Sequence, residues 1–314
     1  MTPLKKEDHC QNVFVDSADI AMSEIESIVS LVAADFDFAA IAPVFEDTVR
    51  LFDGQYPGYR SSLTKYHDAH HTLSVTLATG RLLHGCFLAG HTFSPNDVFL
   101  ALTASLFHDA GLIQKESDTQ GTGAKYTVGH EERSVAFAAA YLAERGATAR
   151  DADTCAAIIR CTIMVVPPES VVFPSPDSAI LGQVVGSADL LAQMADRQYL
   201  EKLVLLFKEF QEARLPGFDS ELDLLQKTSD FYFNIANKRL REGLGGVCDH
   251  MRLHFKDYCG MDTDMYATSI EKNIHYVEKL QQQCGDSYEC YLTNLKRGGI
   301  ALEELKQIKT TTDD

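Results

Sequence analysis

The chain has 314 residues, of which 45% are hydrophobic, and its formal net charge at pH 7 is −17. A chain of this length and composition can bury the core of one large domain or of two smaller ones. The acidic balance argues against nucleic acid or an anionic membrane as a partner, because both would repel such a surface. We therefore expect neither nucleic acid nor a membrane as a partner, while a homodimer stays open.

The sequence also lacks the signs of secretion and of membrane insertion. Its first residues contain no apolar run like that of a signal peptide. No window approaches the roughly 18 apolar residues that a membrane span needs. The eight cysteines are scattered without a C-x-x-C pair, which is typical of a reduced protein rather than a disulfide scaffold or a thiolate zinc site. A cytoplasmic location is expected.

The first informative element is TKYHDAHHTLSV, residues 64–75, which places three histidines close to one aspartate. His67 and His71 are four residues apart, so on a helix they lie on one face, one turn apart. His70 falls about a third of a turn from His71 and need not share a site with it. The segment is either a solvated polar face or a site for a positively charged group.

The helix with the clearest ends is predicted over SPNDVFLALTASLFHDAG, residues 94–111. Ser94 suits the N-cap, Pro95 suits the first helical position, and Asp97 completes a capping-box pattern. Gly111 is placed to end the helix in a left-handed conformation. Between these ends the segment is apolar almost all round, which predicts burial at the centre of the domain.

This apolar helix ends in His108 and Asp109, and burying an unpaired charge is costly. A satisfied core histidine, an aspartate paired with an arginine, or a helix end that reaches solvent would each explain one such dipeptide. A further aspartate, Asp189, lies between apolar segments in VVGSADLLAQM. Three separated helices thus each offer ligands from an apolar context. Imidazole and carboxylate without cysteine form a ligand set for zinc, manganese, iron or magnesium.

Helical periodicity continues through the rest of the chain. Apolar residues recur at three- and four-residue spacing in residues 134–146 and 199–217, and both segments end in glycine. Residues 165–176 contain β-branched pairs, but their four prolines predict a loop or an edge piece. The sequence therefore predicts an all-α bundle, with a helical extension over residues 1–45 and one domain over residues 46–308.

The order of the histidines and aspartates resembles the HD superfamily of metal-dependent phosphohydrolases. Its signature is a histidine, an adjacent His-Asp pair and a distant aspartate, which correspond to His71, His108, Asp109 and Asp189. YHDAHHTLSV is similar to the Y-H-N-x-x-H-x-x-x-V segment of the cyclic-nucleotide phosphodiesterases in that superfamily, with Asp68 in place of asparagine. GSADLL is similar to their C-A-D-L segment. The resemblance covers about residues 60–200 and implies an HD-domain, phosphodiesterase-like helical bundle.

Two features differ from the phosphodiesterase pattern. Those enzymes continue H-D-x-x-H-P-G, whereas this chain has HDAGLIQKES, which is closer to bacterial HD phosphohydrolases. Gln226 is the candidate for the glutamine with which phosphodiesterases grip the nucleotide. His130 follows the His-Asp pair by 22 residues, about where two-metal bacterial HD proteins place another histidine. It is either a contact to a second metal or phosphate, or a histidine in a helix N-terminal His-Glu-Glu cluster that the helix dipole favours.

The resemblance implies a centre with one or two divalent ions, Mn, Mg, Zn or Fe, in which Asp109 bridges the two. Such an ion lowers the pKa of a coordinated water from about 16 to about 7. In the similar phosphodiesterases the histidine at the position of His67 is the general acid, a task that suits the ordinary pKa of histidine, about 6.5. Asp68 or Glu131 could orient this histidine.

The expected function is accordingly that of a metal-dependent phosphohydrolase with His67 and Asp109 as catalytic residues. Its substrate would be a phosphoester of a nucleotide or cyclic nucleotide, and Arg160 or Lys115 could contact the phosphate. A non-catalytic HD-fold regulatory or ligand-binding module is the alternative. An HD-type di-iron oxygenase is a third hypothesis, although it needs more histidines than this chain supplies.

Overall fold

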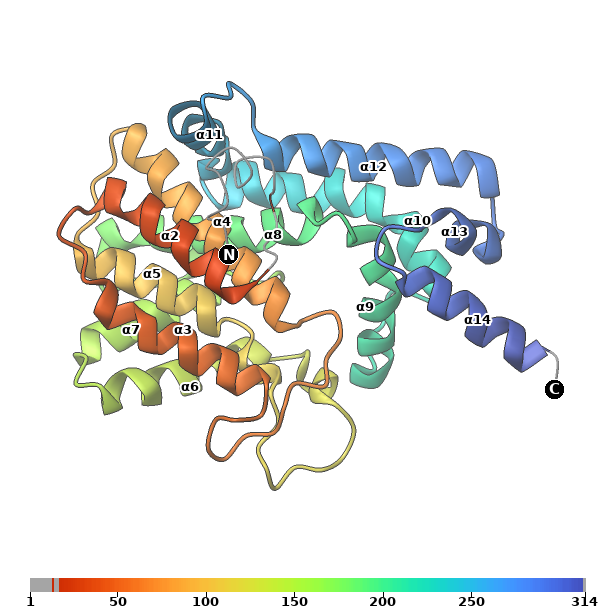
Figure 1. The fold of residues 1–314 in the computed structure, drawn as a ribbon, viewed down its shortest axis with the longest axis horizontal. Coiled ribbons are helices and arrows are strands. Elements are labelled where there is room, and N and C mark those ends of the chain that lie inside the picture. Colours follow the sequence, from red (N-terminus) through yellow and green to blue (C-terminus); the bar gives the residue numbers. More distant parts are fainter. Residues whose placement is uncertain (1–12, 14–16, 313–314) are drawn as a thin grey trace.

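The computed structural model describes residue 13 and residues 17–312, and in this part of the chain all regular elements are helices (Figure 1). The β-type pairing found there is one isolated bridge between Tyr59 and Lys115. None of the helices in the described residues combines the length and the apolar character that crossing a bilayer requires. The predicted all-α fold is confirmed.

The α-helices, in chain order, are α2 (Ala18–Val32), α3 (Phe38–Phe52), α4 (Ala69–Leu88), α5 (Pro95–Phe107), α6 (His130–Glu144), α7 (Ala149–Arg160), α8 (Ala179–Ala195), α9 (Tyr199–Ala213), α10 (Glu221–Phe231), α11 (Met251–Cys259), α12 (Met265–Cys284), α13 (Tyr288–Asn294) and α14 (Ile300–Thr312). Short 3-10 or π-helical segments lie between them: η1 (Ala110–Leu112), η2 (Gly123–Tyr126), η3 (Pro168–Ser170), η4 (Pro176–Ser178), η5 (Tyr232–Ala236), η6 (Arg239–Gly243) and η7 (Val247–His250). The proline-rich stretch over residues 165–176, predicted as a loop or an edge piece, is a connection that contains the 3-10 turn η3 and the first residue of η4. The boundary expected at residue 45 falls within α3.

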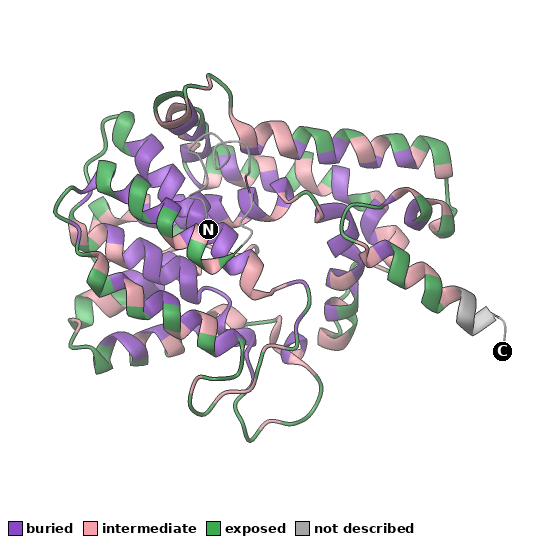
Figure 2. Ribbon diagram, in the orientation of Figure 1, coloured by how far each residue is buried: buried purple, intermediate pink, exposed green. Residues whose placement is uncertain are grey.

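The helix α4 is the centre of the fold. Figure 1 shows α2, α3, α5, α6 and α7 gathered at one end of the molecule, with α9, α13 and α14 at the other. α4 packs against α2, α5, α8 and α11, and all of its residues 71–86 are buried. The buried residues of α4 and α5 form the purple region of Figure 2, whereas α12 and α14 each keep an exposed face. The predicted burial of α5 is confirmed, but α4 shares its central place.

A buried ion pair ties the N-terminal helix α2 to this centre. Arg81 of α4 is 1% exposed, and its guanidinium donates to Glu24 Oε1 of α2 at 2.6 Å and to the Tyr266 hydroxyl of α12 at 3.1 Å. Removing one partner of such a pair leaves an uncompensated charge in the core, which costs about 3–5 kcal/mol. The interaction therefore holds α2, α4 and α12 in one arrangement.

The predicted start of α5 is confirmed, and its predicted end is wrong. Ser94 is the N-cap and forms a capping box with Asp97. The helix ends at Phe107, however, and Gly111 lies in η1 without a left-handed conformation. The glycine is needed there for another reason, because a Cβ atom at this position would lie 1.9 Å from the carbonyl oxygen of His130. Gly111 thus allows α6 to pack closely behind the His-Asp pair.

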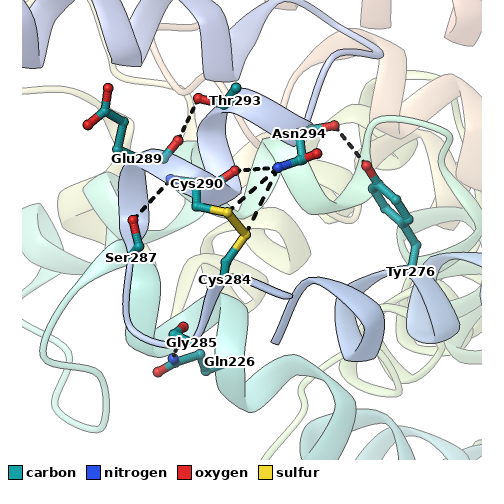
Figure 3. Close-up of a disulfide and its surroundings, with 9 residues drawn as sticks. All are labelled: Gln226, Tyr276, Cys284, Gly285, Ser287, Glu289, Cys290, Thr293 and Asn294. Carbon is teal, nitrogen blue, oxygen red and sulfur yellow. Dashed lines mark hydrogen bonds between the residues drawn. A yellow bond between two sulfur atoms is a disulfide. The ribbon is translucent and has the colours of Figure 1, made fainter. Parts of the chain in front are cut away.

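The expectation of reduced thiols does not hold for Cys284 and Cys290. Cys284 at the end of α12 and Cys290 in α13 form a disulfide, whereas Cys86, Cys155, Cys161 and Cys248 are free and buried. The turn that the disulfide closes is fastened to α10, because Gln226 Nε2 donates to the carbonyl oxygen of Gly285 at 3.2 Å (Figure 3).

Candidate metal centre

Three helices bring the predicted ligands together. Asp68 is the N-cap of α4, and its Oδ1 accepts a hydrogen bond from the backbone N–H of His71 at 2.8 Å. This places His71 in the first turn of the helix. His108 and Asp109 directly follow α5, and Asp189 lies within α8. Aspartate and asparagine are both good N-caps, so the aspartate at position 68 preserves the local structure that the related motif needs.

His71, His108 and Asp109 form a buried group in which one possible ligand atom of each residue lies within 4.8 Å of the others. The Nε2 atoms of the two histidines are 3.4 Å apart. Asp109 Oδ2 lies 3.3 Å from His108 Nε2 and 3.6 Å from His71 Nε2. Asp189 Oδ1 is 3.2 Å from His71 Nε2 and 3.8 Å from His108 Nε2. The structure thus brings the four predicted ligand residues together, with Asp189 beside the group of His71, His108 and Asp109.

The hydrogen bonds of the group fit a metal ion. His108 Nδ1 lies 2.7 Å from the carbonyl oxygen of Ser105, an arrangement that fixes the proton on Nδ1 and leaves Nε2 as the donor to a metal. Asp109 Oδ2 is fully buried, yet within the described chain it accepts no hydrogen bond of good geometry. A buried carboxylate oxygen without such a partner is costly, and coordination to a cation would compensate it.

His130 approaches Asp109 from the other side. Its Nε2 lies 3.2 Å from Asp109 Oδ1, and its Nδ1 lies 2.9 Å from the carbonyl oxygen of Thr127. Gly129, with φ of 85°, forms the turn at the start of α6 that brings His130 to this position. The two oxygens of Asp109 therefore face different histidines.

The negative charge of Asp109 favours a proton on His108. Burial alone lowers the pKa of His108, but the charge of Asp109 outweighs this effect and raises the pKa to about 9. Burial opposes ionisation of Asp109, yet the positive charges of His108 and His67 hold its pKa well below the usual range. Burial also opposes ionisation of Asp189, whose pKa is lowered mainly by the hydrogen bond with His71. A divalent cation bound here must replace the proton on His108 Nε2.

His67 lies next to this group and is bound to a carboxylate that the sequence analysis missed. The ring centroids of His67 and His71 are 6.1 Å apart. His67 Nδ1 is 2.7 Å from Glu209 Oε2 of α9, while Glu209 Oε1 accepts the backbone N–H groups of Lys65 and Tyr66. Burial lowers the pKa of His67, but the charge of Asp109 and the hydrogen bond with Glu209 raise it to about 9.

Neither residue expected to orient His67 forms this bond. Asp68 caps α4, and Glu131 Oε2 instead lies 3.5 Å from His130 Nδ1. Glu209 follows Leu205 and Leu206 by four and three residues, so the helical pattern places its carboxylate on the apolar face of α9. A carboxylate on an apolar helix face can be recognised from the sequence. Glu201 and Lys202 are also buried in α9, however, so the pattern alone does not single out Glu209.

The residues expected to contact a phosphate or a base lie elsewhere. Arg160 forms a bidentate pair with Glu132, at 2.6 and 2.9 Å. Lys115 lines a groove of about 420 Å³ together with Tyr56 and Phe137. Gln226 does not line the cavity beside His67, because its side chain bonds to the turn that the Cys284–Cys290 disulfide closes (Figure 3). The glutamine that does line this cavity is Gln193.

Comparison with known proteins adds one finding. Residues 58–248 match the model of the Npun_R2479-like family, a range that includes the predicted ligands and Glu209. No curated protein and no solved structure matches the chain.

Metal binding at this group is expected to release protons and to strengthen as the pH rises. His108 has a pKa of about 9, so at neutral pH a cation competes with a proton for its Nε2. Calorimetric titration with Mn²⁺ in two buffers of different ionisation enthalpy measures this release, and repeating it at about pH 6 and about pH 8 measures the change in affinity. Binding that is independent of both buffer and pH would contradict the assignment.

Proposed function

The chain belongs to the Npun_R2479-like family, and we propose that it is a metal-dependent phosphohydrolase that acts on a small-molecule phosphoester. The proposal rests on one arrangement: the buried group of His71, His108 and Asp109 lies beside the partly buried pair of His67 and Glu209. A structural metal site needs only the buried group of possible ligands. Hydrolysis of an ester also needs a proton for the leaving group, and His67 with its partner Glu209 provides a proton donor.

The residues that would hold the ions are those of the HD resemblance. His71, His108, Asp109 and Asp189 would hold the first divalent ion, and His130 with Asp109 would hold a second. Such an ion, Mn, Mg, Zn or Fe, would act as a Lewis acid on the phosphoryl group and would acidify the attacking water. The hydrogen bond to Ser105 orients His108, and burial keeps bulk water from competing for the ligands.

In this mechanism His67 gives a proton to the leaving alcohol. Its Nδ1 is bound to Glu209, so Nε2 is the atom that can donate to the oxygen of the breaking bond. The raised pKa, about 9, keeps the imidazole charged at neutral pH, and Glu209 fixes the ring. Glu209 is a positioning residue in this scheme, because it acts on the substrate only through His67.

The sequence suggested a nucleotide phosphoester as the substrate and the cytoplasm as the location, and both are part of the proposal. Nucleotides and cyclic nucleotides are the first esters to test, since the segment around His67 resembles the cyclic-nucleotide phosphodiesterases. The Cys284–Cys290 disulfide is unusual for the cytoplasmic location that the sequence suggested. Thiol labelling of the protein as extracted from cells would show whether Cys284 and Cys290 are paired there.

Replacing the bridging carboxylate should remove both the metal and the activity. Asp109→Asn is expected to lower bound Mn²⁺ to background and to abolish hydrolysis of bis(p-nitrophenyl) phosphate, because the amide cannot supply the charge that the buried cation requires. The matched control is Asp97→Asn, the same change at the opposite end of α5, which should keep both. An Asp109→Asn variant with full metal content and full turnover would refute the proposal. A wild-type protein that binds metal but hydrolyses no ester would instead favour the regulatory or ligand-binding module.

Replacing the proton donor should affect turnover rather than metal content. His67→Ala is expected to lower kcat by about 10²–10⁴-fold for esters of alkyl alcohols, and far less for p-nitrophenyl esters, whose leaving group needs no protonation. Glu209→Gln should lower the pKa of His67, so the fall of activity on the alkaline side of the pH profile moves to lower pH.

The control for this change is Glu212→Gln, one turn further along α9, where the carboxylate instead holds Thr122 at 2.6 and 2.7 Å. That variant should keep the alkaline limb of the wild-type profile. Equal losses on alkyl and p-nitrophenyl esters in His67→Ala would contradict the role of a proton donor.

A further inference from the structure

A cavity of about 210 Å³ lies beside the candidate metal centre, with walls mainly from α9 and α10. Its apolar lining includes Leu203, Leu206, Phe210, Phe218, Leu224 and Phe231. The rings of Phe210 and Phe218 are stacked, with centroids 5.9 Å apart. An engineered protein cavity of about 150 Å³ is known to hold benzene, so this space has room for a larger ring or a short alkyl chain.

His67 connects the cavity to the reacting centre. The same imidazole that lies 6.1 Å from the ring of His71 also lines the cavity. In the proposed reaction His67 donates its proton to the oxygen of the leaving alcohol, so the group attached to that oxygen extends past His67. The cavity therefore lies where the alcohol part of the ester would be held.

The polar side chains of the lining already bond to other protein groups. Gln193 Nε2 donates to the hydroxyl of Tyr66. The hydroxyls of Tyr199 and Thr228 are 2.6 Å apart.

The remaining two polar side chains are held in the same way. Thr127 Oγ1 donates to the carbonyl oxygen of Ala124 at 2.6 Å, and Lys227 Nζ bonds to Asp223 within its own helix at 2.8 Å. A site that reads a nucleobase by its hydrogen-bonding edge presents several polar groups to that edge, whereas this lining is mostly apolar and each of the polar side chains named here has a protein partner.

We infer that the alcohol part of the substrate is an apolar alkyl or aryl group, held in this cavity, rather than a nucleobase recognised through hydrogen bonds. The inference rests on the proposed phosphohydrolase function and narrows its substrate. In the reaction the oxygen of water bonds to phosphorus, and the bond from phosphorus to the alcohol oxygen breaks. His67 supplies the proton that the alcohol gains, and the proton that water loses passes to solvent.

The test compares esters of primary alcohols, so that the bond to be broken is matched. Methyl phosphate, hexyl phosphate, 2-naphthylmethyl phosphate and adenosine 5′-monophosphate are offered with Mn²⁺, each also as its methyl diester. Cyclic adenosine monophosphate, whose 3′ oxygen is that of a secondary alcohol, is tested separately. Burial of a ring or chain should raise kcat/KM for the hexyl and naphthylmethyl esters by roughly 10–100-fold over the methyl ester. The adenosine esters should fall below both apolar esters.

Two variants of the cavity test its role, and one control tests specificity. Phe231→Ala removes part of the cavity wall, and Met164→Trp, at a half-buried position, fills the cavity. Each variant should reduce the preference for the naphthylmethyl ester over the methyl ester at least tenfold. Leu302→Ala, a change at a 52% exposed position of α14 outside the cavity, should leave the preference unchanged.

The possible outcomes separate this inference from the proposed function. A preference for adenosine or cyclic adenosine monophosphate over the apolar esters, or an apolar preference that survives both cavity variants, overturns the inference and leaves a phosphohydrolase. Failure to hydrolyse any ester, bis(p-nitrophenyl) phosphate included, overturns both.

Discussion

The burial of the Asp109 carboxylate among histidines is the constraint on which the candidate site depends. The side chain is almost inaccessible, and its two oxygens face different imidazoles. An isolated charge at this depth would be strongly unfavourable, so the surroundings must supply positive charge, as protons on the histidines or as a cation. Charge balance is kept in either case, which explains why an ionised carboxylate can stand at the end of an apolar helix.

The fold is arranged to hold that charge. α4 is buried along most of its length, and α5 and α8 pack against it, so His71, His108 and Asp189 reach one point from three rigid elements. Side chains on packed helices are positioned more accurately than those on loops. Glu209 of α9 also helps to position the site, because its two oxygens bond to the backbone before α4 and to the ring of His67. The candidate proton donor is therefore positioned by α9 rather than by its own helix.

The sequence allowed the fold class to be predicted, because helices depend on local patterns, and the order of histidines and aspartates along the chain singled out residues that the fold brings together. Helical periodicity, the capping box at Ser94 and the spacing of His67 and His71 are short-range signals. Glu209 could not be assigned in the same way, since its partner His67 is 142 residues away in the chain. Gly111 shows the same limit: local rules predicted a helix end, whereas the need for glycine comes from the approach of α6.

The most direct test of the central claim is anomalous diffraction from crystals of the protein soaked in Mn²⁺. We expect a peak between the side chains of His71, His108, Asp109 and Asp189, and a second peak between Asp109 and His130 if the carboxylate bridges two ions. A fully soaked crystal with no anomalous peak at these side chains, or with manganese only at surface carboxylates, would contradict the account.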